Sequence, residues 1–157
     1  MIMKKVSITV ILILILILST GCEKKDKDLK VINCKIDSVP ADSIKVKRTY
    51  KIYYKKKLVK RTESEDIITS NDKSLIKKYS TAYQSLANRY QDVDNYDFTV
   101  KTKKDKVVVR INIDYDKVDV DKILEIEGKE NNIFTGKKVY LDKLLKWAEE
   151  HGITCEK

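Results

Sequence analysis

Few side chains in this 157-residue sequence have the type and spacing that catalysis requires. The chain contains three cysteines, Cys22, Cys34 and Cys155, and a single histidine, His151. A catalytic or metal-binding histidine needs partners at helical or hairpin spacing, and none stands near His151 in the sequence. His151 falls in the last turn of an expected helix, where a cation suits the helix dipole, so we predict a structural or neutral role for it.

Carboxylates gather in three places and invite a calcium or acid–base interpretation. Residues 92–97 begin like an EF-hand loop, but Asp97 stands where that loop needs glycine and Lys103 where it needs a bidentate glutamate. Residues 114–116 depart from the loop pattern in a similar way. The third group is Glu63, Glu65 and Asp66. Two of its members could share a proton or a metal ion, but we interpret all three groups as solvated faces and predict no metal and no cofactor.

The motifs of the common enzyme classes do not occur. The sequence contains no G-x-S-x-G elbow, no P-loop, no G-x-G-x-x-G fingerprint and no C-x-x-C pair. Its four glycines could hardly build a phosphate cradle. Because no nucleophile, base and oxyanion donors can be named together, we predict no catalytic residues and a protein that is not an enzyme, and we rank a hydrolase last.

The first 21 residues have the pattern of an export signal. Lys4 and Lys5 form a short basic segment, and residues 6–18 are apolar apart from Ser7 and Thr9. As a helix, residues 6–18 would span about 20 Å, which is short of the ~30 Å hydrocarbon core of a bilayer. The segment is therefore typical of a signal peptide rather than of a stable membrane span.

The end of this segment, Leu18-Ser19-Thr20-Gly21-Cys22, resembles the lipobox of bacterial lipoproteins. Gly21 and Thr20 fit the small positions before the cysteine, whereas Ser19 stands where a branched apolar residue is usual. We predict cleavage between Gly21 and Cys22 and lipidation of Cys22, which would anchor the chain on the extracytoplasmic side of the cell membrane. Residues 22–30 would then be the lipidated cysteine and a charged tether, and residues 31–157 the folded domain. An ordinary signal peptide with a chance cysteine, or an uncleaved anchor, is the alternative.

Two thiols remain once Cys22 carries a lipid. Exported proteins meet an oxidising compartment, and Cys34 lies in the first expected strand whereas Cys155 lies in the last. If those strands are neighbours, a Cys34–Cys155 disulfide would close a loop of about 120 residues. Two buried free thiols are the alternative.

Two hydrophobic periods organise the chain after residue 30. Alternating apolar and polar residues predict strands at 32–36, 44–54, 58–64, 96–101, 107–115 and 153–155, with turns at 38–42, 55–57 and 103–106. Apolar residues at spacings of three and four predict helices at 73–91, 121–127 and 141–151, and 129–138 is expected to be a loop. This order predicts a single α+β domain, in which antiparallel β-hairpins form a sheet packed by two main helices. Arg48 interrupts the apolar side of the strand at 44–54.

Charge and aromatic content restrict the partners. The formal net charge is +9, of which Lys4 and Lys5 contribute two, and the basic residues are spread along the chain. We interpret them chiefly as a solubilising surface. For an exported protein, an anionic partner would be a membrane headgroup or a cell-wall polymer and not nucleic acid. The nine tyrosines belong either to the core or to an aromatic platform for a glycan or peptide.

Several of these segments together resemble the YehR-like small bacterial lipoproteins. The resemblance rests on the lipobox, the tyrosine-rich strand at 44–54, Lys-Tyr-x-x-x-Tyr at 78–83, Val-Val-Val-Arg-Ile-Asn-Ile-Asp-Tyr at 107–115 and Leu-x-x-x-x-Glu-Glu-His-Gly at 144–152. It implies an α+β domain tethered to a membrane. That family has no established activity, so the resemblance brings no catalytic residues, and its members need not contain Cys34 and Cys155.

The sequence therefore favours a membrane-anchored envelope lipoprotein that binds an envelope protein, a cell-wall polymer or a small ligand without catalysis. A structural or envelope-stress component without a ligand is the alternative. The two hypotheses differ in one structural feature, because a concave pocket lined by tyrosines and convergent polar groups favours binding.

Overall fold

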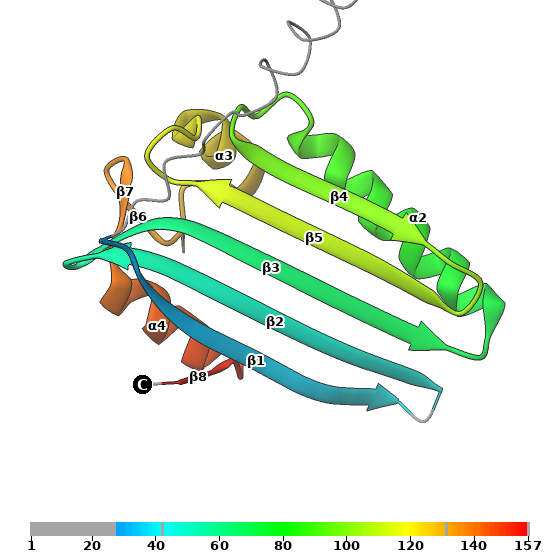
Figure 1. Cartoon of the computed structure of the whole chain (residues 1–157). Coiled ribbons are helices and arrows are strands. Elements are labelled where there is room, and N and C mark those ends of the chain that lie inside the picture. The colour runs from blue at the N-terminus through cyan, green and yellow to red at the C-terminus, as the bar shows by residue number, and fades with distance from the viewer. Residues whose placement is uncertain (1–27, 42, 131, 157) are drawn as a thin grey trace, which may run out of the picture.

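Alternating sequences form the strands of one antiparallel sheet (Figure 1). The computed structural model describes residues 28–41, 43–130 and 132–156, so the predicted signal at 1–21 and Cys22 lie outside the described residues. The strands of the sheet are β1 (Lys30–Ala41), β2 (Ile44–Lys55), β3 (Leu58–Ser70), β4 (Tyr96–Thr102), β5 (Lys106–Asp114) and β8 (Thr154–Cys155). They lie in the order β4-β5-β3-β2-β1-β8, and every neighbouring pair is antiparallel.

Three helices cover one face of this sheet, which we call the covered face (Figure 1). They are α2 (Lys73–Tyr90), α3 (Val120–Glu127) and α4 (Leu141–Glu150). A small hairpin of β6 (Phe134–Thr135) and β7 (Lys138–Val139) lies between α3 and α4 in the chain. The fold is a single α+β domain, as the sequence predicts. None of the described helices is long and apolar enough to cross a bilayer.

Local signals set the helix ends. Asp72 caps α2 by accepting a 2.7 Å hydrogen bond from the Ser74 backbone N–H, and hydrogen bonds from Ser74 lower the pKa of this carboxyl. Asp119 caps α3 in the same way. Gly152 follows α4 with φ of +72°, a conformation that glycine adopts without steric cost, and there the chain turns back toward the sheet.

The structure corrects the expected elements at three places. Residues 38–41 continue β1 instead of forming a turn, with a shift of register between Ser38 and Ala41. Pro40 lies within this irregular stretch, where the register gives it no partner on β2, so its missing backbone N–H interrupts no pair of the ladder. Strand β3 runs six residues beyond its expected end, to Ser70, and the expected loop at 129–138 contains β6 and the start of β7.

Candidate functional site

Two neighbouring rows of side chains across the sheet form the floor of the candidate site. One row runs through Cys34, Tyr50, Ser64, Ile111 and Phe98, each paired in register with the next. The other runs through Ile32, Ile52, Thr62, Ile113 and Tyr96. Because side chains two residues apart on a strand share a face, both rows lie on the covered face.

The helices do not fill the space above these rows. A cavity of about 230 Å³ lies between the sheet, the C-terminal end of α3, the loop before β6 and α4. Its aromatic wall consists of Tyr50, Tyr96, Tyr115 and Trp147. Its apolar wall includes Ile52, Ile111, Ile113, Ile133, Leu144 and Ile153. An apolar cavity with a small number of placed polar groups is typical of a small-molecule site.

Four polar side chains reach this cavity: Thr62, Ser64, Glu127 and Asn132. Thr62 is buried, and its hydroxyl donates to the Tyr115 hydroxyl at 3.4 Å. Glu127, the last residue of α3, accepts a 2.8 Å hydrogen bond from the Tyr90 hydroxyl. These groups converge from the floor and from the α3 side, so a ligand would meet hydroxyl groups on one side and a carboxylate on another.

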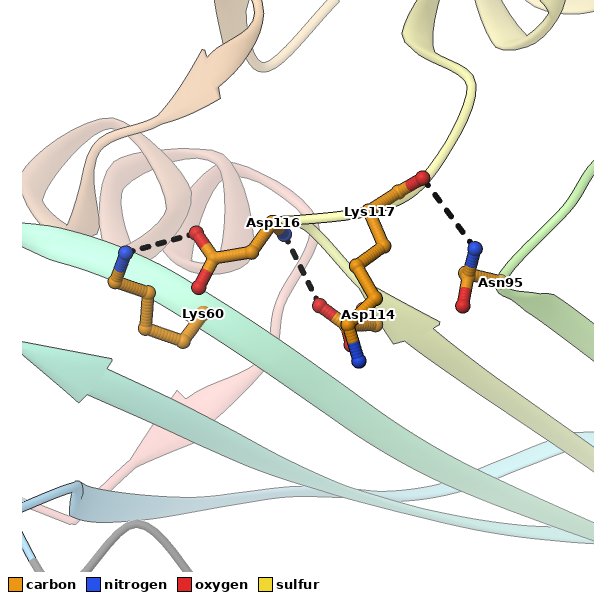
Figure 2. Close-up of polar contacts among 5 residues, drawn as sticks. All are labelled: Lys60, Asn95, Asp114, Asp116 and Lys117. Atoms are coloured by element: carbon orange, nitrogen blue, oxygen red, sulfur yellow. Dashed lines mark hydrogen bonds and ion pairs between the residues drawn. The ribbon is translucent and has the colours of Figure 1, made fainter.

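Tyr115 of the cavity wall lies in a tight turn after β5. Figure 2 shows the polar contacts of the residues on either side of it. The Asp116 backbone N–H donates to Asp114 Oδ1 at 3.1 Å, and the side chains of the two aspartates pair with lysines: Asp116 with Lys60 at 2.8 Å and Asp114 with Lys117 at 3.0 Å. The Tyr115 backbone N–H donates to the Lys60 carbonyl at 2.8 Å, which ties the turn to β3. These carboxylates, considered above as cation ligands, serve here to hold the turn.

The tyrosines of the cavity wall stay neutral at physiological pH. Burial raises the pKa of Tyr115 to about 12, and burial also raises the pKa of Tyr50 and of Tyr96. The charge of Glu127 raises the pKa of Tyr96 further, because a phenolate would be repelled by the carboxylate. The aromatic wall therefore offers uncharged rings and hydroxyl groups.

An ion pair occupies the next row of the covered face. Arg48 Nε donates to Asp66 Oδ1 at 2.6 Å, and Arg48 Nη2 donates to Asp66 Oδ2. This pair explains the charged residue that interrupts the apolar side of β2. The three carboxylates that the sequence suggests as one acidic group do not lie together. Asp66 points to the covered face, whereas Glu63 and Glu65 lie on the opposite face.

On that opposite face, Glu65 binds Arg110 at 2.6 Å and Glu63 accepts from the Tyr53 hydroxyl at 3.0 Å. Glu63 also pairs with Arg61 at 3.3 Å. Within the described part of the chain, no three His, Cys, Asp or Glu side chains gather closely enough to hold a metal ion.

Cys34 and Cys155 lie beside the cavity and join the first strand to the last. They face each other in the β1–β8 pair, with Cα atoms 3.9 Å apart and an S–S distance of 2.08 Å. The Glu156 backbone N–H donates to the Asn33 carbonyl at 2.8 Å and extends the pairing. The bond fixes the end of the chain that carries Ile153 into the cavity wall.

His151 has a structural partner in the same region. Its ring stacks on Trp147 with centroids 4.4 Å apart, and its Nδ1 lies 2.7 Å from the Trp147 carbonyl oxygen. This contact orients the indole ring that lines the cavity. His151 itself lines an outer hollow together with Lys143, Lys146 and Glu150, and this hollow shares Asn132, Ile133 and Trp147 with the cavity.

Of the residues singled out from the sequence, the structure brings Cys34 and Cys155 together and gathers three of the tyrosines around one cavity. Gly21 and Cys22 lie outside the described residues. The other residues named in the cavity lining were not expected from the sequence, among them Thr62, Ser64, Glu127, Asn132 and Trp147. Only the alternation of β3 could have indicated Thr62 and Ser64, because it places them on the face that their neighbouring strands fill with apolar residues.

The sequence matches no protein-family profile, and no curated protein matches it. Among solved structures, the NMR structure of the E. coli YehR protein is similar with a TM-score of 0.56 at 18% identity, over 79% of this chain and 90% of that one. An NMR structure of a protein from Streptococcus pneumoniae TIGR4 is similar with a TM-score of 0.50 at 15% identity, over 81% of this chain and 86% of that one. The fold is YehR-like. The comparison therefore confirms the fold that the sequence resemblance implies.

Proposed function

We propose that this chain is a membrane-anchored envelope lipoprotein that binds a small ligand in the cavity of about 230 Å³, without catalysis. The observation that carries the binding proposal is the cavity itself, which combines an aromatic and apolar lining with convergent polar groups. A purely structural domain gains nothing from such a space, because unfilled volume in a core costs stability.

The anchoring part of the proposal is supported by the N-terminal sequence, in which a basic segment, an apolar segment and Gly21-Cys22 follow one another. Strand β1 begins at Lys30, eight residues after Cys22. A fully extended chain of that length spans at most about 28 Å. A lipid on Cys22 would therefore keep the cavity close to the membrane surface.

The binding proposal is tested by blocking the cavity. Ser64→Leu places a larger side chain in the middle of the cavity floor, and Thr49→Leu makes the same type of change at an exposed position on the opposite face of β2. A fragment screen by ligand-observed NMR should find compounds that bind the wild-type domain and Thr49→Leu but not Ser64→Leu. A screen without binders, or with binders that Ser64→Leu leaves unaffected, would show that the cavity does not bind ligands.

The anchor is tested by changing its attachment residue. Cys22→Ala should abolish incorporation of labelled fatty acid and processing at residue 22, because the thiol that carries the lipid is gone. Cys155→Ala is the matched control, since it removes a cysteine far from the signal and should leave labelling unchanged. Continued lipid labelling of Cys22→Ala would show that the lipobox interpretation is wrong.

A further inference from the structure

The charge and aromatic content of the cavity lining distinguish between classes of ligand. Among its described lining residues, Glu127 is the one formally charged side chain, and four aromatic rings share the space with it. The tyrosines are neutral, as shown above, so they add no charge of their own. A ring face carries partial negative charge, so aromatic rings attract cations. The lining is therefore suited to a positive group.

Glu127 is an exposed residue, and among the described residues no cationic side chain pairs with it. Its Oε1 accepts from the Tyr90 hydroxyl, and no described residue forms a hydrogen bond or an ion pair with its Oε2. Arg89, which lies nearby on α2, donates to the Ile126 carbonyl at 2.6 Å instead. The cationic residues Lys143 and Lys146 line the outer hollow and not the cavity.

The position of Glu127 is independently unusual. It is the last residue of α3, and the last turn of this helix contains no basic residue. A carboxylate at a helix C-terminus faces the negative end of the helix dipole, which is unfavourable unless a cation is near. The Arg89 guanidinium on the Ile126 carbonyl already offsets part of this repulsion. A cation bound in the cavity would offset more of it and would lie against rings that favour positive charge.

We propose that the cavity takes a small organic ammonium ion, with Glu127 as the counter-charge and Tyr50, Tyr96, Tyr115 and Trp147 as the surrounding rings. This inference rests on the proposed function, because it names the ligand class of the same cavity. Size is consistent with it: a cavity of about 150 Å³ holds one benzene molecule, so about 230 Å³ accommodates a trimethylammonium group with a short polar tail. Thr62, Ser64 and Asn132 provide partners for a hydroxyl group on that tail.

The test compares three probes of one shape. Choline carries the positive charge. Its neutral isostere, 3,3-dimethylbutan-1-ol, has carbon in place of the quaternary nitrogen. The anion 3,3-dimethylbutanoate, called tert-butylacetate below, carries a negative charge on a carbon skeleton of similar size. Binding is followed by the fluorescence of Trp147, the only tryptophan in the sequence, which lines the cavity. We expect choline to bind at least about tenfold more tightly than the isostere, and tert-butylacetate to bind most weakly.

Glu127→Gln keeps the shape and removes the charge, so it should weaken choline at least about tenfold and leave the isostere unchanged. Glu125→Gln, at an exposed position on α3 that does not line the cavity, is the matched control and should bind choline like the wild type. Equal binding of choline and isostere, preferential binding of tert-butylacetate, or unchanged choline binding by Glu127→Gln would overturn the ligand class while leaving the cavity a binding site. If neither choline nor its isostere binds, this inference fails, and the fragment screen then decides whether the cavity binds ligands of another class.

Discussion

The covered face of the sheet is built differently at its two ends. At the α2 end, Ile44, Ile68, Ile76, Val107 and Val109 form a buried apolar cluster that α2 closes. At the opposite end, α3, α4 and the loop between them cover the sheet and leave the tyrosine-lined cavity. The Arg48–Asp66 pair lies in register beside Val109, at the border between the two ends. The same sheet therefore has a close-packed end, which contributes stability, and an end that contains a cavity. At the cavity end, the Cys34–Cys155 disulfide and the turn after β5 hold the walls in place.

The disulfide is the strongest of the contacts that hold the cavity walls, and its removal should have the largest effect on the free energy of unfolding. Replacing both Cys34 and Cys155 by serine should lower the free energy of unfolding by about 4–5 kcal/mol in the chain-entropy description, because the bond closes most of the chain into one loop. Chemical denaturation of the variant and of the oxidised and reduced wild-type domain measures this. Hydrogen exchange should show faster opening of β8 and α4, with the amides of β5 under α2 still protected.

Two results would contradict the disulfide prediction. If thiol titration of the unfolded, unreduced protein finds both Cys34 and Cys155 free, the bond does not form. Alternatively, exchange could accelerate equally under α2 and around the cavity, which would show that the two ends unfold as one unit and that the comparison above does not hold.

Truncation of one isoleucine at each end sharpens the comparison. Ile68 is 1% exposed at the α2 end, and Ile68→Ala should cost about 3 kcal/mol, because the truncation leaves a void in a close-packed cluster. Ile113 is half-buried and already borders the cavity, so Ile113→Ala should cost about 1 kcal/mol. Denaturant titration of the two variants measures both costs. An equal or larger cost at Ile113 would mean that the cavity end is packed as closely as the α2 end.

The difference between the two ends also explains what could be predicted from the sequence. The packing at the α2 end can be predicted from the spacing of apolar residues alone. Apolar residues alternate in β2, β3 and β5 and recur every three or four residues in α2. This spacing places them on the surfaces of sheet and helix that face each other. Each of these elements begins within a residue of its expected start. The strand order could not be read, because β5 and not β4 pairs with β3, and such a choice depends on contacts between segments far apart in the chain.

The cavity end depends on features that no local period expresses. In the sequence, Glu127 has the character of the polar end of a short helix, and Trp147 lies among charged residues on α4. Neither pattern indicates a residue that lines a cavity. Both residues line the cavity, and Trp147 lies on the helix after which the chain returns to β1 through β8. Asp66 is close to Glu63 and Glu65 in the sequence, yet alternation places it on the other face, where Arg48 pairs with it. Its partner could be identified only with the β2–β3 register.

A predicted effect smaller than the loss of the disulfide concerns Tyr115 of the cavity end at alkaline pH. Burial raises the pKa of Tyr115 from 10.0 to about 12, so the folded state holds this proton where the unfolded state releases it. The stability contributed by the neutral, buried phenol is complete below the pKa of the unfolded state and is lost as pH rises through the folded value. For Tyr115 alone, this linkage lowers the free energy of unfolding by about 2–3 kcal/mol across that interval.

Denaturation curves at increasing pH, with phenolate absorbance followed in parallel, measure this loss. Tyr115→Phe should show a smaller alkaline decrease than the wild type, because Phe has no proton to release. Thr62→Val should have the opposite effect on the alkaline decrease. The Thr62 hydroxyl donates to the Tyr115 hydroxyl and lowers the pKa of Tyr115. Removing that hydroxyl should therefore raise the pKa of Tyr115 further and extend the decrease in stability to higher pH. If all three proteins lose stability in parallel, the alkaline transition arises outside the cavity, and the buried phenol does not distinguish this end of the sheet.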